Sequence, residues 1–126
     1  MKKMILLFSH NLTDEQKSDA RASFGVEQFV VLPDDLQTIW SNIPADLEDL
    51  NEYLQPIQKF LTDNIQKGDI ALVQGDFGAT CSIAYFVKSI EGVAVYATTK
   101  RDVVEKEIDG KIVKTSVFEH VRFRMF

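Results

Sequence analysis

The sequence predicts an α/β protein whose sheet is mostly parallel and flanked by helices, and three observations support this class. Four runs of strand length are apolar throughout rather than alternating, which is typical of parallel strands buried on both faces. The segments between these runs show helical spacing of their apolar residues. A tail of alternating polarity follows and predicts antiparallel strands at the C-terminal end.

The first strand and the first helix have clear boundaries. Residues 4–8 form an apolar run of strand length, and the polar residues after them predict its end. Thr13 and Gln16 have the spacing of a capping box, and Gly25 fits the position just past a helix end. We therefore expect the first helix to lie between Thr13 and Gly25.

The remaining elements repeat this alternation. The other predicted strands cover residues 28–32, 69–73 and 93–98. The other predicted helices are a short one through Trp40, one from Asp46 to the stop at Lys67-Gly68, and one over 79–90. Pro56 is compatible with the predicted helix that starts at Asp46 only as a kink or in the first turn of a second segment. This order implies right-handed crossovers and a Rossmann-like core, and Asp109-Gly110 predicts a hairpin turn in the tail.

Composition and charge limit the class of protein. The chain has 126 residues, 45% of them hydrophobic, so we expect one domain over residues 1–126. No run approaches the ~20 apolar residues that cross a bilayer, and the lone Cys81 cannot form an internal disulfide, so we expect a cytoplasmic protein with no membrane partner. The net charge of −5 argues against long nucleic acid held through its phosphates. Residues 99–126 nevertheless carry seven Lys and Arg against five Asp and Glu, which favours a small anion at that end.

The polar residues that follow three of the strands form the candidate site. In open α/β sheets, ligands bind outside the carboxyl ends of the parallel strands, where helix N-termini present free N–H groups. The candidate ligand-binding residues are Ser9, Asn11, Gln74, Gly75, Phe77, Gly78, Ala79, Thr80, Thr98 and Thr99. The candidate catalytic residues are His10, Asp76 and Arg101. No His or Cys cluster has metal-ligand spacing, so we expect neither a metal nor a cofactor.

Two interpretations of these residues stay open. In the loop QGDFGAT at 74–80, Gly75 and Gly78 would let backbone amides approach a phosphate, while Asp76 could accept a hydrogen bond from a sugar hydroxyl or a base amine. The alternative is that the two glycines serve only tight packing of strand against helix. His10 is either a proton-transfer or base-contacting group or simply a polar end to the first strand. The loop matches neither the Walker A motif nor the dinucleotide-binding fingerprint.

Five segments spread over nearly the whole chain resemble one family. They read LLFSHNLTDEQ, FVVLPDDLQTIWSNIP, GDIALVQGDFGAT, VYATTKR and FEHVRFR. Together they are similar to the small CRISPR-associated Csx accessory proteins of type III systems, specifically the Csx family numbered twenty. The resemblance implies a CARF-like domain, usually a homodimer, that binds cyclic oligoadenylate second messengers. It also implies ring nuclease activity, in which cyclic tetra-adenylate is cleaved.

Such cleavage requires positioning and charge stabilisation rather than a metal. A ribose 2′-hydroxyl attacks the adjacent phosphorus and leaves a 2′,3′-cyclic phosphate. We expect Arg101 to stabilise the charge, the loop over 75–80 to position phosphate and sugar, and His10 to transfer a proton or contact adenine. A protein that only sequesters the ligand would need the same pocket, and a CRISPR-complex scaffold would make the glycines purely structural. The apolar helix over 79–90 and the Trp40 segment are the candidate dimer interfaces.

Overall fold

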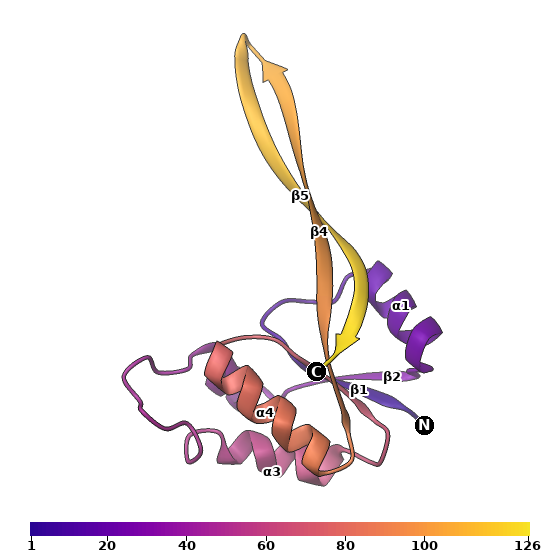
Figure 1. Ribbon diagram of the computed structural model, residues 1–126, viewed down its shortest axis with the longest axis vertical. Helices are drawn as coiled ribbons and strands as arrows, with labels where there is room; N and C mark the ends of the chain where they lie inside the picture. The colour runs from indigo at the N-terminus through magenta and orange to yellow at the C-terminus, as the bar shows by residue number, and fades with distance from the viewer.

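The computed structural model describes residues 1–126 as one five-stranded sheet with four helices (Figure 1). In chain order the elements are β1 (Lys3–Leu7), α1 (Asp14–Phe24), β2 (Gln28–Val31), α2 (Asp34–Ser41), α3 (Gln55–Asn64), β3 (Ile70–Val73), α4 (Phe77–Ser89), β4 (Val93–Ile108) and β5 (Lys111–Met125). The strand order is β2-β1-β3-β4-β5, and all neighbours are parallel except β4 and β5. The predicted α/β class, the mostly parallel sheet and the C-terminal antiparallel pair are therefore confirmed. None of the helices combines the length and the apolar character that spanning a membrane requires.

The central strands β1 and β3 are buried on both faces of the sheet. One core lies between the sheet and helices α2, α3 and α4, and a smaller core lies between the sheet and α1. Along β1, Ile5 and Leu7 belong to the first core, whereas Met4 and Leu6 belong to the second. Burial of successive side chains on opposite faces explains why the strands are apolar throughout. Trp40 lies in the first core with only 2% of its surface exposed, so it is not available as a dimer interface.

The ends of α1 are fixed by the residues that the sequence indicated. The Thr13 hydroxyl accepts a hydrogen bond from the Gln16 backbone N–H at 3.2 Å, and the Gln16 side chain accepts one from the Thr13 N–H at 2.9 Å. Gly25 ends the helix in the left-handed conformation, with φ of 69°. The predicted capping box and the predicted glycine end are both confirmed.

The helix expected from Asp46 begins only at Gln55, after a segment of turns. Pro56 stands in its first turn, which is one of the two placements that the sequence allowed. In a helix interior the proline ring would clash with the preceding turn and remove a hydrogen bond, whereas the first turn has no such bond to lose. Leu54 is fully buried, but Leu47 in the turn segment is 43% exposed. The apolar spacing therefore continues across the proline although the helix does not.

Strand β4 runs well beyond residue 98, where the sequence analysis wrongly placed its end, and reaches Ile108. It pairs with β3 only from Val93 to Val95, and its partner over the rest of its length is β5. The two strands leave the body of the protein together as a long twisted ribbon (Figure 1). We call residues 99–119 of this ribbon the arm, and every one of them is exposed.

The turn at the tip of the arm is the one that the sequence predicted. Asp109 and Gly110 both have positive φ, of 52° and 74°, as a two-residue type I′ turn requires. At the base, the register shifts between Thr98 and Thr99, which leaves Val121 without a partner on β4. Such a bulge bends the ribbon and increases its twist where it leaves the sheet.

His120 fixes the base of the arm to α1. Its Nε2 lies 2.7 Å from Oδ2 of Asp19, and the His120 side chain is only 4% exposed. The Ser23 hydroxyl donates to the other carboxylate oxygen of Asp19 at 2.6 Å. Burial tends to raise the pKa of Asp19, but the hydrogen bonds from Ser23 and His120 and the charges of His120 and Arg122 hold it below its usual value. This pair therefore joins β5 to α1 at the point where the body ends.

Candidate functional site

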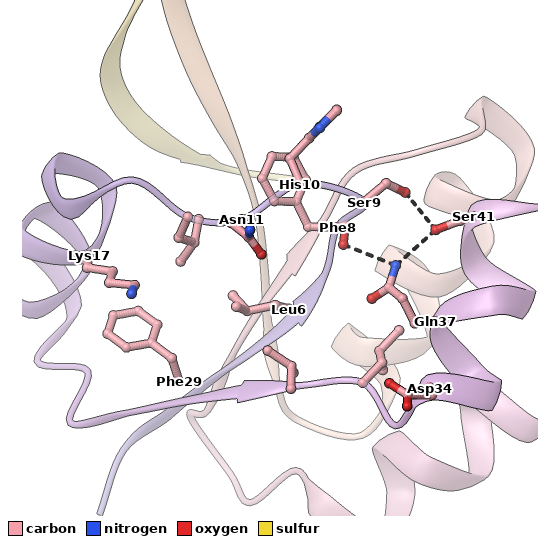
Figure 2. A pocket seen from close by; sticks show the side chains of 13 residues that line it. Leu6, Phe8, Ser9, His10, Asn11, Lys17, Phe29, Asp34, Gln37 and Ser41 are labelled. Atoms are coloured by element: carbon pink, nitrogen blue, oxygen red, sulfur yellow. Dashed lines mark hydrogen bonds between the residues drawn. The ribbon is translucent and has the colours of Figure 1, made fainter.

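A cavity of about 550 Å³ opens at the carboxyl ends of β1 and β2, and we call it the β1–β2 pocket (Figure 2). It is lined by Leu6, Phe8, Ser9, His10, Asn11, Leu12, Lys17, Phe29, Val31, Leu32, Asp34, Gln37 and Ser41. These residues come from the end of β1 and the loop after it, from α1, from β2 and from α2. The pocket therefore lies where the strand-end rule places ligands in open α/β sheets.

Hydrogen bonds hold the loop after β1 against α2. The Gln37 side-chain amide donates to the Phe8 carbonyl at 3.2 Å and to the Ser41 hydroxyl at 2.9 Å. The Ser9 and Ser41 hydroxyls lie 3.0 Å apart. Figure 2 shows this network on the α2 side of the pocket, with Lys17 approaching from α1 on the other side. One wall is thus fixed by hydrogen bonds, and the opposite wall carries a cation.

The chemistry of the lining suits a nucleotide. Phe8 and Phe29 supply aromatic surface, and the His10 ring lies edge-on to Phe8 with a centroid distance of 5.3 Å. Lys17 is half-buried and supplies a positive charge, and the amide of Asn11 adds a donor and an acceptor. Bases stack on aromatic rings, and phosphates bind cations and N–H donors. No group of three or more His, Cys, Asp or Glu side chains is arranged so that it could hold a metal ion.

A second, smaller cavity of about 290 Å³ lies beside α4, and we call it the α4 pocket. Its lining consists of Val73, Gln74, Gly75, Phe77, Thr80, Cys81, Tyr96 and Phe126. Gln74 connects the end of β3 to β4 here, because its side-chain oxygen accepts from the Ala97 N–H at 2.8 Å. The Thr80 hydroxyl is buried in the protein without a hydrogen-bond partner.

The segment QGDFGAT was expected as a loop before a helix over 79–90, but its last four residues form the first turn of α4, which begins at Phe77. Packing and helix capping explain much of this segment. A Cβ on Gly75 would lie 3.1 Å from Nε1 of Trp40, which donates to the Gln74 carbonyl at 3.1 Å. The Asp76 carboxylate caps α4 by accepting from the Ala79 N–H at 3.1 Å. A Cβ on Gly78, in contrast, would meet its neighbours only at an ordinary 3.5 Å. Packing therefore accounts for Gly75, and helix capping accounts for Asp76.

The predicted site residues divide between several places. Ser9, His10 and Asn11 line the β1–β2 pocket. Gln74, Gly75, Phe77 and Thr80 line the α4 pocket, and the two pockets share no lining residue. Ala79 is completely buried, and its N–H is already bound to Asp76. Thr98 donates its hydroxyl hydrogen to the Arg122 carbonyl within the ribbon, and Thr99 begins the arm.

Arg101 lies on the arm and lines neither pocket. Its guanidinium donates to the Ser116 hydroxyl from Nε at 3.3 Å and from a terminal nitrogen at 3.1 Å. Arg101 was expected at the sheet edge because the fourth strand was expected to end at residue 98. Arg124 lies closer to a pocket, since it donates to the Tyr96 hydroxyl at 3.0 Å and Tyr96 lines the α4 pocket.

Sequence reasoning missed four polar residues of the β1–β2 pocket. Three of them come from α2, namely Asp34, Gln37 and Ser41, and the fourth is Lys17 of α1. The strand-end rule was applied to three strand ends but not to the end of the second strand. Applied there, it would have selected the start of α2. Lys17 follows the capping box by one residue, so its place near the strand end was also accessible from the sequence.

These features define a small α/β protein with a polar pocket at the carboxyl ends of parallel strands and a projecting β-ribbon. The chain belongs to the Uncharacterized protein MJ1673 family, whose sequence profile matches residues 2–124. It is 46% identical over 126 residues to Uncharacterized protein MJ1673 of Methanocaldococcus jannaschii, an alignment that covers 100% of this chain and 98% of that relative. No solved structure matches the chain significantly.

Proposed function

We propose that this protein is a CARF-like, Rossmann-like ring nuclease of type III CRISPR systems that acts in the cytoplasm on cyclic oligoadenylate. One observation carries the proposal, namely that Ser9, His10 and Asn11 line a single pocket together with the cation of Lys17. The resemblance of five sequence segments to the Csx family numbered twenty supplies the ligand class.

The pocket has the right size for part of the ligand. Its volume of about 550 Å³ falls within the range of roughly 300–1,000 Å³ that is usual for small-molecule sites. We propose that it holds one adenylate unit, with the base against the Phe29 ring and the phosphate beside Lys17. The rest of the ring remains outside the pocket.

The reaction we propose needs only groups of this chain and of the ligand. The 2′-oxygen attacks phosphorus, a new oxygen–phosphorus bond forms, and the bond to the 5′-oxygen breaks with its electron pair leaving on that oxygen. His10 takes the proton of the 2′-hydroxyl and returns one to the 5′-oxygen. Lys17 stabilises the charge on the phosphoryl oxygens, a role that the sequence analysis gave to Arg101. The product is a linear oligoadenylate with a 2′,3′-cyclic phosphate end.

The test is to incubate the protein with cyclic tetra-adenylate, with and without EDTA, and to analyse the products by chromatography and mass spectrometry. We expect cleavage in both conditions. A charge-assisted hydrogen bond is worth about 1.5–3 kcal/mol, and ~1.4 kcal/mol corresponds to a factor of ten in rate. Lys17→Met should therefore slow single-turnover cleavage by about tenfold or more.

Lys67→Met is the matched control, because Lys67 lies between α3 and β3 at the opposite end of the sheet. It removes the same charge and should leave the rate unchanged. Equal rates for Lys17→Met and the parent protein would remove the β1–β2 pocket from the mechanism. Binding without cleavage would instead identify a protein that sequesters the ligand, and failure to bind would reject the ligand class.

A further inference from the structure

The arm exposes a large share of the molecule's apolar side chains. Eight of the fifteen exposed large hydrophobic residues lie on the arm or at its base, namely Val103, Val104, Ile108, Ile112, Val113, Val117, Phe118 and Val121. A two-stranded ribbon by itself is marginally stable in water, and its two free edges favour pairing with another chain. The arm therefore has the composition of a surface that is covered by a partner.

The strand register places four of these side chains on one face of the arm. Val104 pairs with Thr115, and both Val113 and Val117 are diagonal neighbours of Val104 on the same face. Ile108 continues the row toward the tip as a diagonal neighbour of Val113. We call Val104, Ile108, Val113 and Val117 the aliphatic stripe. It is continuous over most of the length of the arm.

The charges of the arm favour a second copy of this chain over a nucleic acid. Residues 99–119 carry five Lys and Arg and five Asp and Glu, so their net charge is zero. A nucleic-acid partner would require a basic surface. A surface with equal numbers of positive and negative side chains can pair with a second copy of itself without net repulsion.

We propose that the arm packs face to face and antiparallel on the arm of a second copy, about a two-fold axis at Val104. In this arrangement each β4 residue lies opposite the partner's β4 residue that is equally far from Val104 on the other side. Asp102 then faces the partner's Lys106. On β5, by the same symmetry about Thr115, Lys111 faces the partner's Glu119. Each contact occurs twice, as an isologous interface requires.

The antiparallel arrangement also pairs three of the four residues of the aliphatic stripe with one another. Ile108 is the exception, because it lies opposite the partner's Lys100 at the end of the contact. Val104 meets the partner's Val104, and Val113 meets the partner's Val117. A parallel arrangement would place β4 over the partner's β5, so that Asp102 would lie on the partner's Val117 and Lys106 on the partner's Val113. That arrangement would bury charges against apolar groups, which is costly. Charge and apolar matching therefore select the same orientation.

The size of the arm predicts how strongly it associates. A strand rises about 3.3 Å per residue, so the face from Lys100 to Ile108 is about 26 Å long, and two strands make it about 10 Å wide. One arm then contributes roughly 260 Å² of flat area, compared with about 800 Å² per partner in a standard interface. We therefore expect a weak, concentration-dependent dimer rather than an obligate one.

Sedimentation analysis of the full-length protein from micromolar to several hundred micromolar tests the proposal. The mass should rise from that of the 14.3 kDa monomer toward twice this value. Lys106→Glu places a carboxylate opposite the partner's Asp102 and should weaken dimerisation by about tenfold or more. The double variant Asp102→Lys with Lys106→Glu exchanges the two signs and should recover dimerisation to within about threefold of the parent.

Lys114→Glu is the matched control. Lys114 lies on the opposite face of the arm, where its Nζ is 3.7 Å from a carboxylate oxygen of Glu105 in the same arm. We therefore expect the Lys114→Glu variant to dimerise like the parent. A monomer at every concentration, equal losses from Lys106→Glu and Lys114→Glu, or no recovery in the double variant would each overturn the proposal. None of these residues lines the β1–β2 pocket, so the result is independent of the proposed ring nuclease activity.

Discussion

The body and the arm share strand β4 but differ in what surrounds it. Val95 in the body is fully buried and pairs with both β3 and β5, whereas Val103 in the arm is 56% exposed and pairs with β5 alone. Burial of apolar surface supplies most of the free energy of folding. The stability of the protein therefore resides in the body, while the apolar residues of the arm remain available for binding.

The largest expected effect contrasts a buried aromatic residue with an exposed arm residue. Trp40→Ala should lower the free energy of unfolding by about 3–5 kcal/mol, because it removes a fully packed side chain from the larger core. Val103→Ala should change it by less than about 0.5 kcal/mol. Urea unfolding of both variants gives the comparison. Similar losses would show that the arm contributes to the folded core.

A smaller effect separates the two glycines of the QGDFGAT loop. Gly75→Ala brings a methyl group 3.1 Å from the Trp40 indole and should destabilise the body by about 1–3 kcal/mol. Gly78→Ala lies in the first turn of α4, where there is space, and should be neutral or stabilise by up to about 1 kcal/mol. Thermal unfolding distinguishes the two. Equal effects would contradict the packing explanation of Gly75.

The smallest effect concerns the junction between body and arm. The pKa of Asp19 is lower in the folded protein than in the unfolded chain, so its stabilising contribution is complete above the unfolded pKa and is lost as the pH falls through the folded pKa. The free energy of unfolding should therefore fall more steeply below about pH 4 in the parent than in Asp19→Asn. Chemical unfolding across this range measures both slopes. Identical slopes in the two proteins would show that Asp19 does not contribute to the loss of stability in acid.

Local signals in the sequence predicted their structures well. Helix caps and tight turns depend only on residues close to them in the sequence, so no knowledge of the tertiary fold is needed to predict them. The examples here are Thr13 with Gln16, Gly25, and Asp109 with Gly110. Pro56 likewise stands at one of the two places that its missing N–H allows. The alternation of apolar runs and helical segments was sufficient to predict the α/β fold class.

What the sequence did not predict depends on which segments meet in space. The end of the fourth strand was placed at residue 98 because the apolar run stops there, but β5 extends the pairing to Ile108. For the same reason Arg101 was expected at the sheet edge rather than on the arm. Lys17 and Gln37 were missed for a different reason, because the strand-end rule was not extended to the helices that begin after the first and second strands.

Whether the β1–β2 pocket is the site of cleavage is tested most directly by comparing single-turnover cleavage of cyclic tetra-adenylate by Lys17→Met and Arg101→Ala. Both remove one positive charge, the first from the β1–β2 pocket and the second from the arm. We expect Lys17→Met to cleave more slowly than the parent by about tenfold or more, while Arg101→Ala stays within about twofold. A tenfold loss of cleavage rate confined to Arg101→Ala would show that the pocket is not the site of cleavage and would place the reaction beside the arm.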